Sequence, residues 1–220
     1  MNKLDLGNFE AVIFDMDGVL VDSEPLWKTA MEEVFHNLGS KLTKQDFQKT
    51  VGMRIDQVIT YWKEIENWKE NTQNIENQII NKMINLINTE GRPLPGVIET
   101  TNYLYKTKKT ALASSSPHRL INAVLKQTKL SSCFHGIFSA ERESHGKPHP
   151  AVFLSAASFL GIAPSKCLVI EDSLTGVIAG KAANMTVVCI PEKTHFQNPK
   201  LTLADYHFDS MLEFYRAINI

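Results

Sequence analysis

The chain has 220 residues and carries 23 basic and 24 acidic side chains, which gives a formal net charge of −1 at pH 7. This length exceeds one average domain and falls short of two, so it favours one core domain with a sizeable insertion. The balanced charge argues against nucleic acid or an acidic membrane surface as a partner, and the three cysteines are too few and too far apart for a disulfide framework or a zinc site.

The N-terminal segment, MNKLDLGNFEAV, lacks the apolar stretch of a signal peptide, and no run of the sequence is long enough to span a membrane. We therefore expect a cytoplasmic, monomeric enzyme or binding protein that acts on a small molecule.

The first apolar run, residues 9–14, predicts a buried strand that ends abruptly at Asp15. Asp17 and Gly18 follow at once. Two acids at positions i and i+2 of an extended strand end point to the same side, and glycine lets the backbone turn tightly behind them. Taken alone, such a pair is also typical of a turn with Asx hydrogen bonds, so its meaning depends on the rest of the chain.

The next segment has a helical character throughout and contains no convincing strand pattern. Apolar residues recur at helical spacing in four runs, at 25–39, 43–52, 54–65 and 74–90. The stretch EGRPLPG, with two prolines and two glycines, then marks a return linker. We therefore predict a four-helix cap domain at 23–91, inserted into a core domain formed by 1–22 and 92–220.

After the linker, helical and strand patterns alternate. Helices are predicted at 96–107, 117–128, 151–161 and 174–184, and strands at 110–116, 166–173, 185–191 and 204–210, before a closing helix. Such alternation predicts an α/β fold with a parallel sheet that is covered by helices on both faces.

Polar side chains stand where three of the predicted strands end. They are Asp15 with Asp17, the serines at 114–116, and Glu171 with Asp172, and the loop at 144–150 adds Lys147. Ligands of such sheets bind beyond the carboxyl ends of the strands, so neighbouring strands would bring all four groups into one crevice.

This combination of side chains suits a hard cation together with a phosphate. Taken singly, a serine before a proline is commonly a helix cap and a loop lysine is commonly solvated. Taken together, the carboxylates suit Mg²⁺, an aspartate can serve as a nucleophile, and lysine and hydroxyls can neutralise a phosphoryl group.

Four motifs carry a resemblance to a known family. DMDGVLVDSE, LASSS, GKPHP and VIEDSLTG resemble the four motifs of the haloacid dehalogenase superfamily of phosphatases, over essentially the whole chain from Phe9. The resemblance implies a Rossmann-like core, a helical cap inserted after the first motif, and Mg²⁺ as cofactor. Within the superfamily, DSEPLW, GMRID and KPHP look like the group of sugar-phosphate and hexitol-phosphate phosphatases, with β-phosphoglucomutases as near relatives.

The resemblance also implies roles for the acids. Asp15 resembles the nucleophile and a Mg²⁺ ligand, and Asp17 resembles the general acid/base, whose main-chain carbonyl also meets the metal. Asp172 resembles the second metal carboxylate, with Glu171 at the edge of the metal.

The remaining predicted site residues would contact the substrate. Ser114 and the amide of Ser115 resemble phosphate binders, and Lys147 resembles the charge that neutralises nucleophile and phosphate. Arg54, near the start of a cap helix, is a candidate to bind a second polar end of the substrate.

Three functions fit these residues. The first is a Mg²⁺-dependent phosphatase of small sugar or sugar-alcohol phosphates that works through an aspartyl-phosphate, the second is a sugar phosphomutase, and the third is a phosphate sensor, which needs no acid/base. Trp27 favours hydrolysis over the mutase reaction. In the mutases that this chain resembles, the matching position looks like a histidine that assists the acid/base. An indole N–H can donate a hydrogen bond but has no acceptor, so Trp27 cannot take that role. We expect Trp27 to pack inside the cap or to form an apolar wall for a ligand, with burial inside the cap favoured.

Overall fold

The computed structural model describes residues 4–50, 52–191 and 198–219. Within these residues six strands form one sheet in the order β3-β2-β1-β4-β5-β6, and every neighbouring pair is parallel. The strands are β1 (Ala11–Phe14), β2 (Lys109–Ser114), β3 (Gly136–Ser139), β4 (Cys167–Glu171), β5 (Thr186–Cys189) and β6 (Tyr206–His207). Phe14 is in register with Leu112 on one side and with Ile170 on the other, so β1 lies between β2 and β4.

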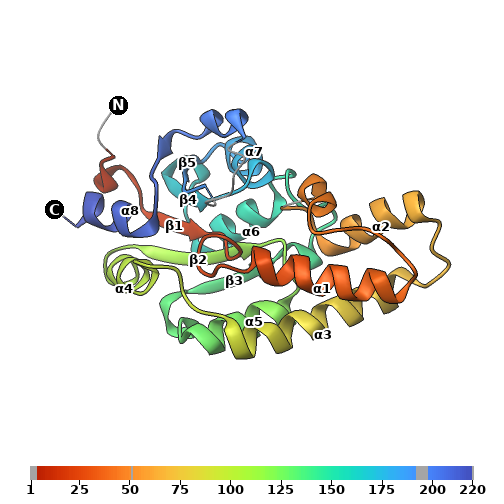
Figure 1. The fold of residues 1–220 in the computed structure, drawn as a ribbon. Helices are drawn as coiled ribbons and strands as arrows, with labels where there is room; N and C mark the ends of the chain where they lie inside the picture. The colour runs from red at the N-terminus through yellow and green to blue at the C-terminus, as the bar shows by residue number, and fades with distance from the viewer. Residues whose placement is uncertain (1–3, 51, 192–197, 220) are drawn as a thin grey trace.

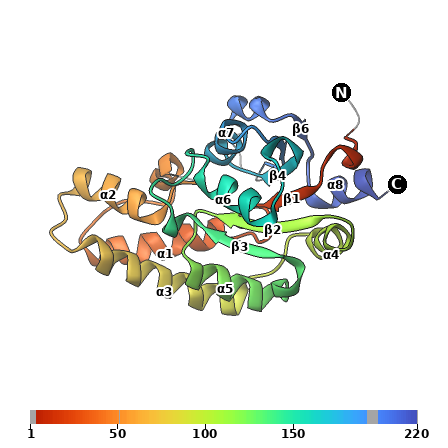
Figure 2. The ribbon, with the colours of Figure 1, turned by 180° about the vertical axis from the view of Figure 1, so that it is seen from behind.

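Helices cover both faces of this sheet (Figures 1 and 2). They are α4 (Val97–Thr107), α5 (His118–Thr128), α6 (Ala151–Leu160), α7 (Leu174–Ala182) and α8 (Met211–Ile218). Val12 and Phe14 belong to the apolar cluster that contains α4, α5 and α8, whereas Ala11 and Ile13 belong to the cluster that contains α6 and α7. The alternation of side chains along β1 therefore feeds two cores, and the predicted α/β fold is confirmed.

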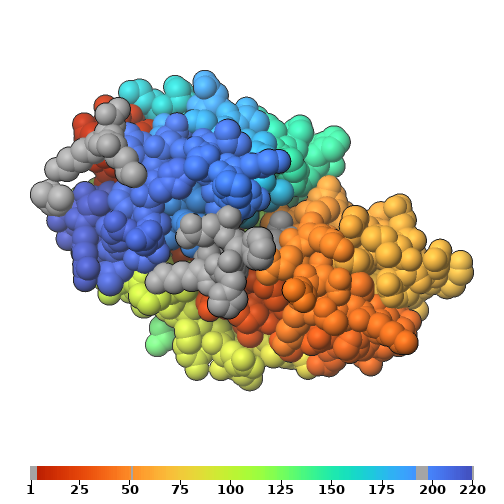
Figure 3. Space-filling model, turned by 45° about the horizontal axis from the view of Figure 1, so that its top comes forward, coloured from red at the N-terminus to blue at the C-terminus, as the bar shows by residue number. Residues whose placement is uncertain are grey.

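The segment between β1 and α4 is helical, with α1 (Glu24–Asn37), α2 (Ile55–Glu66) and α3 (Thr72–Glu90). Helix α3 lies beside α5, and the first apolar cluster continues from the sheet into this segment through side chains such as Phe35, Phe47 and Trp62. Figure 3 shows the orange surface of this segment beside the blue surface of the C-terminal part of the chain. We call residues 24–90 the helical insertion.

Two local predictions differ from the structure. Strand β3 was not predicted, because its four residues at the sheet edge, three of them half-buried, give too short a pattern to stand out. The run at 43–52 was predicted as a fourth cap helix, but the residues described there form a short 3₁₀ helix, Asp46–Thr50, and no α-helix. Thr43 does bond the Asp46 carboxylate in the manner of a helix start, but Gly52 adopts a positive φ of 77° and leaves too few residues for a second turn.

None of the helices among the described residues combines the length and the apolar character needed to cross a membrane.

Candidate active site

The central strands bring their polar ends to the same edge of the sheet. Asp15 directly follows β1, and its amide donates to the carbonyl of Ile170 at 2.9 Å, which extends the ladder by one residue. Ser114 ends β2 and Glu171 ends β4, on either side. Asp15, Asp17, Ser114, Ser115, Lys147, Glu171 and Asp172 all line one pocket at this edge.

Lys147 lies in the connection between β3 and α6 and is almost fully buried. Its ammonium donates to Asp15 Oδ1 at 2.5 Å, to Glu171 Oε1 at 2.7 Å and to the carbonyl of Ala113 at 3.2 Å. Burial by itself lowers the pKa of Lys147, but the two carboxylates outweigh it, so the net pKa is raised. Lys147 is therefore a fixed positive charge at the base of the pocket.

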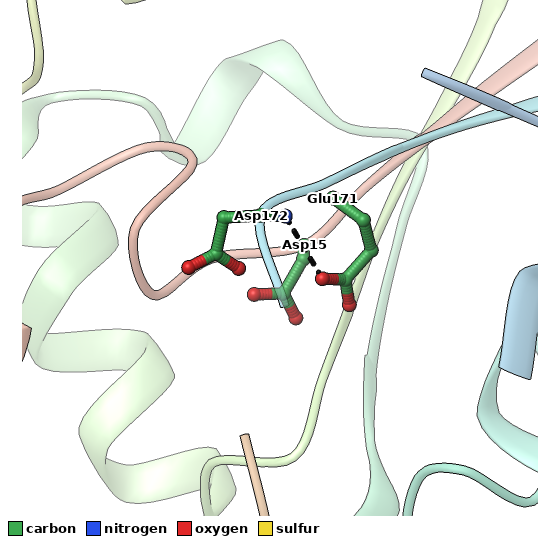
Figure 4. Close-up of side chains that lie close together, drawn as sticks. All are labelled: Asp15, Glu171 and Asp172. Carbon is green, nitrogen blue, oxygen red and sulfur yellow. Dashed lines mark hydrogen bonds between the residues drawn. The ribbon is translucent and has the colours of Figure 1, made fainter. Parts of the chain in front are cut away.

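Three carboxylates meet around this lysine, and one oxygen from each of Asp15, Glu171 and Asp172 lies within 4.8 Å of the others (Figure 4). Burial raises the pKa of Asp15 to about 8, although Lys147 acts in the opposite direction. Burial, Glu171 and Asp15 likewise raise the pKa of Asp172. Crowded acids of this kind favour a bound cation, and a donor set made only of oxygen suits Mg²⁺.

Glu171 is fully buried, and the two residues that follow it hold its carboxylate in place. Its Oε2 accepts from the amide of Asp172, the amide of Ser173 and the Ser173 hydroxyl, each at 3.0 Å. A Cβ at Gly176, in the first turn of α7, would overlap the same carboxylate. The orientation of Glu171 is therefore set by the start of α7.

Gly18 allows the loop after β1 to approach β4. Its φ is +73°, and a Cβ at this position would collide with Asp172 Oδ2. Any other residue would be strained at this positive φ and would displace the Asp172 carboxylate.

Asp17 accepts three hydrogen bonds. Ser23 Oγ and Trp27 Nε1 donate to its Oδ1 at 2.5 and 3.0 Å, and Ser116 Oγ donates to its Oδ2 at 2.7 Å. The expected burial of Trp27 within the cap is wrong, because its half-buried indole lines the pocket and contacts Asp17.

Sequence reasoning missed Ser23 and Ser116 as partners of Asp17. Ser23 occupies the N-cap position of α1, yet its side chain makes no capping bond among the described residues. Ser23 and Trp27 are four residues apart, which places both on one side of the helix start and is a signal the sequence did contain. Ser116 was interpreted as a possible helix cap, but its hydroxyl donates to Asp17 instead.

The two serines predicted to bind phosphate lie beside this group. Ser114 is fully buried, and its hydroxyl accepts from the amide of Ser116 at 3.0 Å. Ser115 is half-buried, and its hydroxyl makes a long bond of 3.5 Å to the carbonyl of Gly52 in the helical insertion.

The helical insertion supplies the opposite wall of the pocket. Most of the side chains it contributes there are apolar or aromatic, namely Trp27, Met31, Phe47, Met53, Ile55 and Val58. Glu24 also lines this wall and forms an ion pair of 3.2 Å with Lys28.

Arg54 does not line the pocket. It precedes α2, and its guanidinium forms two hydrogen bonds of 2.7 and 2.8 Å with Asp56. Its Nη1 also donates to the carbonyls of Ala140 and Glu143, at 2.9 and 3.0 Å. Arg54 thus joins the insertion to the loop that leads to Lys147, and its guanidinium donors are engaged with Asp56 and these two carbonyls.

The chain resembles a set of known proteins along most of its length. A model described as haloacid dehalogenase-like hydrolase matches residues 12–190. Hexitol phosphatase B of Escherichia coli strain K12 is 38% identical over 207 residues, which covers 92% of this chain and 93% of that protein.

Solved structures agree with this likeness. A β-phosphoglucomutase from Clostridium difficile has a TM-score of 0.81 at 27% identity, and the match covers 93% of this chain and 92% of the mutase chain. CbbY from Rhodobacter sphaeroides, solved with phosphate, has a TM-score of 0.85 at 20% identity. The match covers 96% of this chain and 100% of the CbbY chain, and at this identity it supports the fold alone.

Proposed function

Because the chain belongs to the haloacid dehalogenase-like hydrolase family, we propose that it is a Mg²⁺-dependent phosphatase of small sugar or sugar-alcohol phosphates. The observation that carries the proposal is the placement of Asp15, whose carboxylate lies at the base of the pocket between Lys147 and two further acids. The named activity of hexitol phosphatase B, a relative over nearly its whole length, supports the choice of substrate class.

Asp15 is the nucleophile in this proposal. One of its carboxylate oxygens forms a bond to phosphorus while the bond from phosphorus to the sugar oxygen breaks, which leaves an aspartyl-phosphate. Asp17 gives a proton to the departing alkoxide and then takes a proton from the water that attacks the aspartyl-phosphate. Inorganic phosphate leaves, and both aspartates return to their first state.

The other residues of the core side neutralise charge. Lys147 holds Asp15, and Ser114 with the amide of Ser115 binds the phosphoryl oxygens. Asp15, Asp172 and the main-chain carbonyl of Asp17 would hold Mg²⁺, with Glu171 at its edge. A bound Mg²⁺ would reduce the repulsion between the nucleophilic carboxylate and the phosphate dianion.

We also propose that the chain divides into a core domain of 1–22 and 92–220 and a cap domain of 23–91. Helices α1, α2 and α3 lie between β1 and α4, and the described residues of that segment include no strand of the sheet, which supports this division. A monomer that acts in the cytoplasm is part of the same proposal.

The direct test is phosphate release from a panel of phosphorylated metabolites, with hexitol and hexose phosphates beside nucleotides and phosphoamino acids. Asp15→Asn measures the background of contaminating phosphatase. We expect the highest kcat/KM on the sugar and sugar-alcohol phosphates, and only with Mg²⁺ present. Phosphate release that is equal in excess chelator, or confined to another class, contradicts the proposal.

The second candidate is a sugar phosphomutase, which the likeness to the C. difficile β-phosphoglucomutase favours. A phosphorus NMR time course with β-glucose 1-phosphate and catalytic glucose 1,6-bisphosphate separates the two. We expect inorganic phosphate as the main product, whereas glucose 6-phosphate that accumulates faster than phosphate supports the mutase.

A further inference from the structure

The carboxylate of Asp17 is bonded unevenly at its two oxygens. Among the described residues, Oδ1 accepts from both Ser23 Oγ and Trp27 Nε1, whereas Oδ2 accepts only from Ser116 Oγ. An ionised carboxylate offers about four acceptor positions, two on each oxygen. The part of the chain that the structure describes takes three of these positions, and the fourth is on Oδ2.

Trp27 is the partner of Asp17 that cannot change its role. The hydroxyls of Ser23 and Ser116 can rotate and either donate or accept, but an indole N–H only donates. Wherever Asp17 carries its proton, the position of Oδ1 that faces Trp27 remains an acceptor. The ring is also held by its helix, since Trp27 is in the first turns of α1 and its amide donates to the carbonyl of Ser23 at 2.9 Å.

We propose that Trp27 is a positioning residue, which together with Ser23 anchors Oδ1 of Asp17 and leaves Oδ2 as the oxygen that exchanges the proton. This inference rests on the proposed phosphatase reaction. The proton leaves Oδ2 for the oxygen of the departing alcohol, and a proton from the attacking water returns to Oδ2. The orientation of the acid/base in the core is thereby set by a helix of the insertion.

The same insertion contains a matched control. Trp62, on α2, is buried, and its Nε1 has no hydrogen-bond partner among the described residues. A Trp→Phe change at position 62 therefore removes an indole N–H from the insertion without removing a hydrogen bond.

The first measurement compares kcat/KM of Trp27→Phe for two substrates, an alkyl phosphate and 4-nitrophenyl phosphate. This parameter reports steps up to release of the alcohol, and nitrophenolate departs without a proton from Asp17. We expect a roughly tenfold or larger loss with the alkyl phosphate and a loss below about threefold with the aryl phosphate, because one hydrogen bond to a charged group is removed. Trp62→Phe should leave the ratio between the two substrates at the wild-type value.

A role of Trp27 in packing alone would lower both values alike, and equal losses overturn the proposal. If Trp27→Phe does not fold, Ser23→Ala removes the other donor to Oδ1, and the same change in ratio is expected. An unchanged ratio in that variant contradicts the proposal equally.

The second measurement does not depend on activity. The indole Nε1–H resonance of Trp27 is identified in ¹⁵N-labelled protein by its loss in Trp27→Phe. We expect Asp17→Ala to move this resonance and to speed its exchange with water, while the Trp62 resonance stays in place. If the Trp27 resonance is the same in Asp17→Ala, the contact between the two side chains is overturned. If the resonance changes but the wild-type protein has no phosphatase activity, the contact is upheld. The proposed function is then rejected, and the positioning role with it.

Discussion

The two walls of the pocket are built from different chemistry. The sheet edge contributes ionisable side chains, of which Asp15, Lys147 and Glu171 are buried and Asp172 is half-buried. Lys147 bonds both Asp15 and Glu171, and the amide of Asp172 donates to Glu171. The helical insertion contributes mainly apolar and aromatic side chains. Trp27 of the insertion and Ser23, which directly precedes it, supply two of the three donors to Asp17.

This difference separates the reaction from the choice of substrate. A phosphoryl group needs fixed charges, and the ends of strands hold such charges more rigidly than a loop can. An apolar wall excludes water and selects by shape, so changes in the insertion should alter binding before they alter chemistry. Trp27 and Ser23 are the exceptions that connect the two walls.

The largest effect is expected at the sheet edge, for Asp15→Asn. A neutral amide cannot attack phosphorus usefully, so we expect phosphate release to fall roughly 10⁴-fold or more, with the fold retained. Steady-state phosphate release and a thermal melt measure the two properties, and mass spectrometry controls for deamidation. More than a few per cent of wild-type activity in undeamidated protein removes Asp15 as nucleophile.

Lys147→Met is expected to have the next largest effect. It removes the ammonium that bonds Asp15 and Glu171 and should lower kcat roughly 10²–10³-fold. It also leaves buried carboxylates uncompensated, which we expect to lower the Tm. Lys181→Met is the matched control, because Lys181 forms a more exposed ion pair with Asp205. This variant should leave kcat unchanged. A similar loss of kcat in both variants refutes the role of Lys147.

The acid cluster predicts how stability depends on pH without metal. The pKa of Asp15 is raised by burial to about 8 from an ordinary 3.8, so the folded chain holds its proton more tightly than the unfolded chain. Its contribution to stability is complete below the ordinary pKa and is lost as the pH rises through about 8. We expect the Tm in chelator to fall between about pH 5 and about pH 8.5, and Mg²⁺ to raise the Tm more at the higher pH. A Tm in chelator that is flat or rises over this range contradicts the direction.

The smallest effect is expected at the junction of the two walls, for Arg54→Ala. This change removes the bonds from the insertion to the carbonyls of Ala140 and Glu143. We expect KM to rise by a factor of roughly 3–10 with little change in kcat, equally for substrates with and without a second charged group. A loss of binding confined to doubly charged substrates would restore Arg54 to the substrate site.

Much of the fold, and the pocket wall formed by the sheet edge, could be predicted from the sequence. The acids and hydroxyls follow directly on apolar strands, so their order along the chain already places them at one edge of a parallel sheet. The helical period of the insertion was also visible. Strand β3 and the 3₁₀ helix Asp46–Thr50 were not recognised, because four or five residues carry too little periodicity to overcome local ambiguity.

Tertiary structure alone decided which groups complete the site. Ser116 reaches Asp17 across 99 positions of the chain, and Arg54 reaches Ala140 across 86. Local propensity specifies a serine before a helix and an arginine at a helix start, but not what those side chains meet. The sequence by itself therefore determined the strand ends that carry the acids. The packing of the insertion against the core decided how Asp17 is oriented and placed Arg54 outside the pocket. Both depend on contacts between segments that are far apart in the chain.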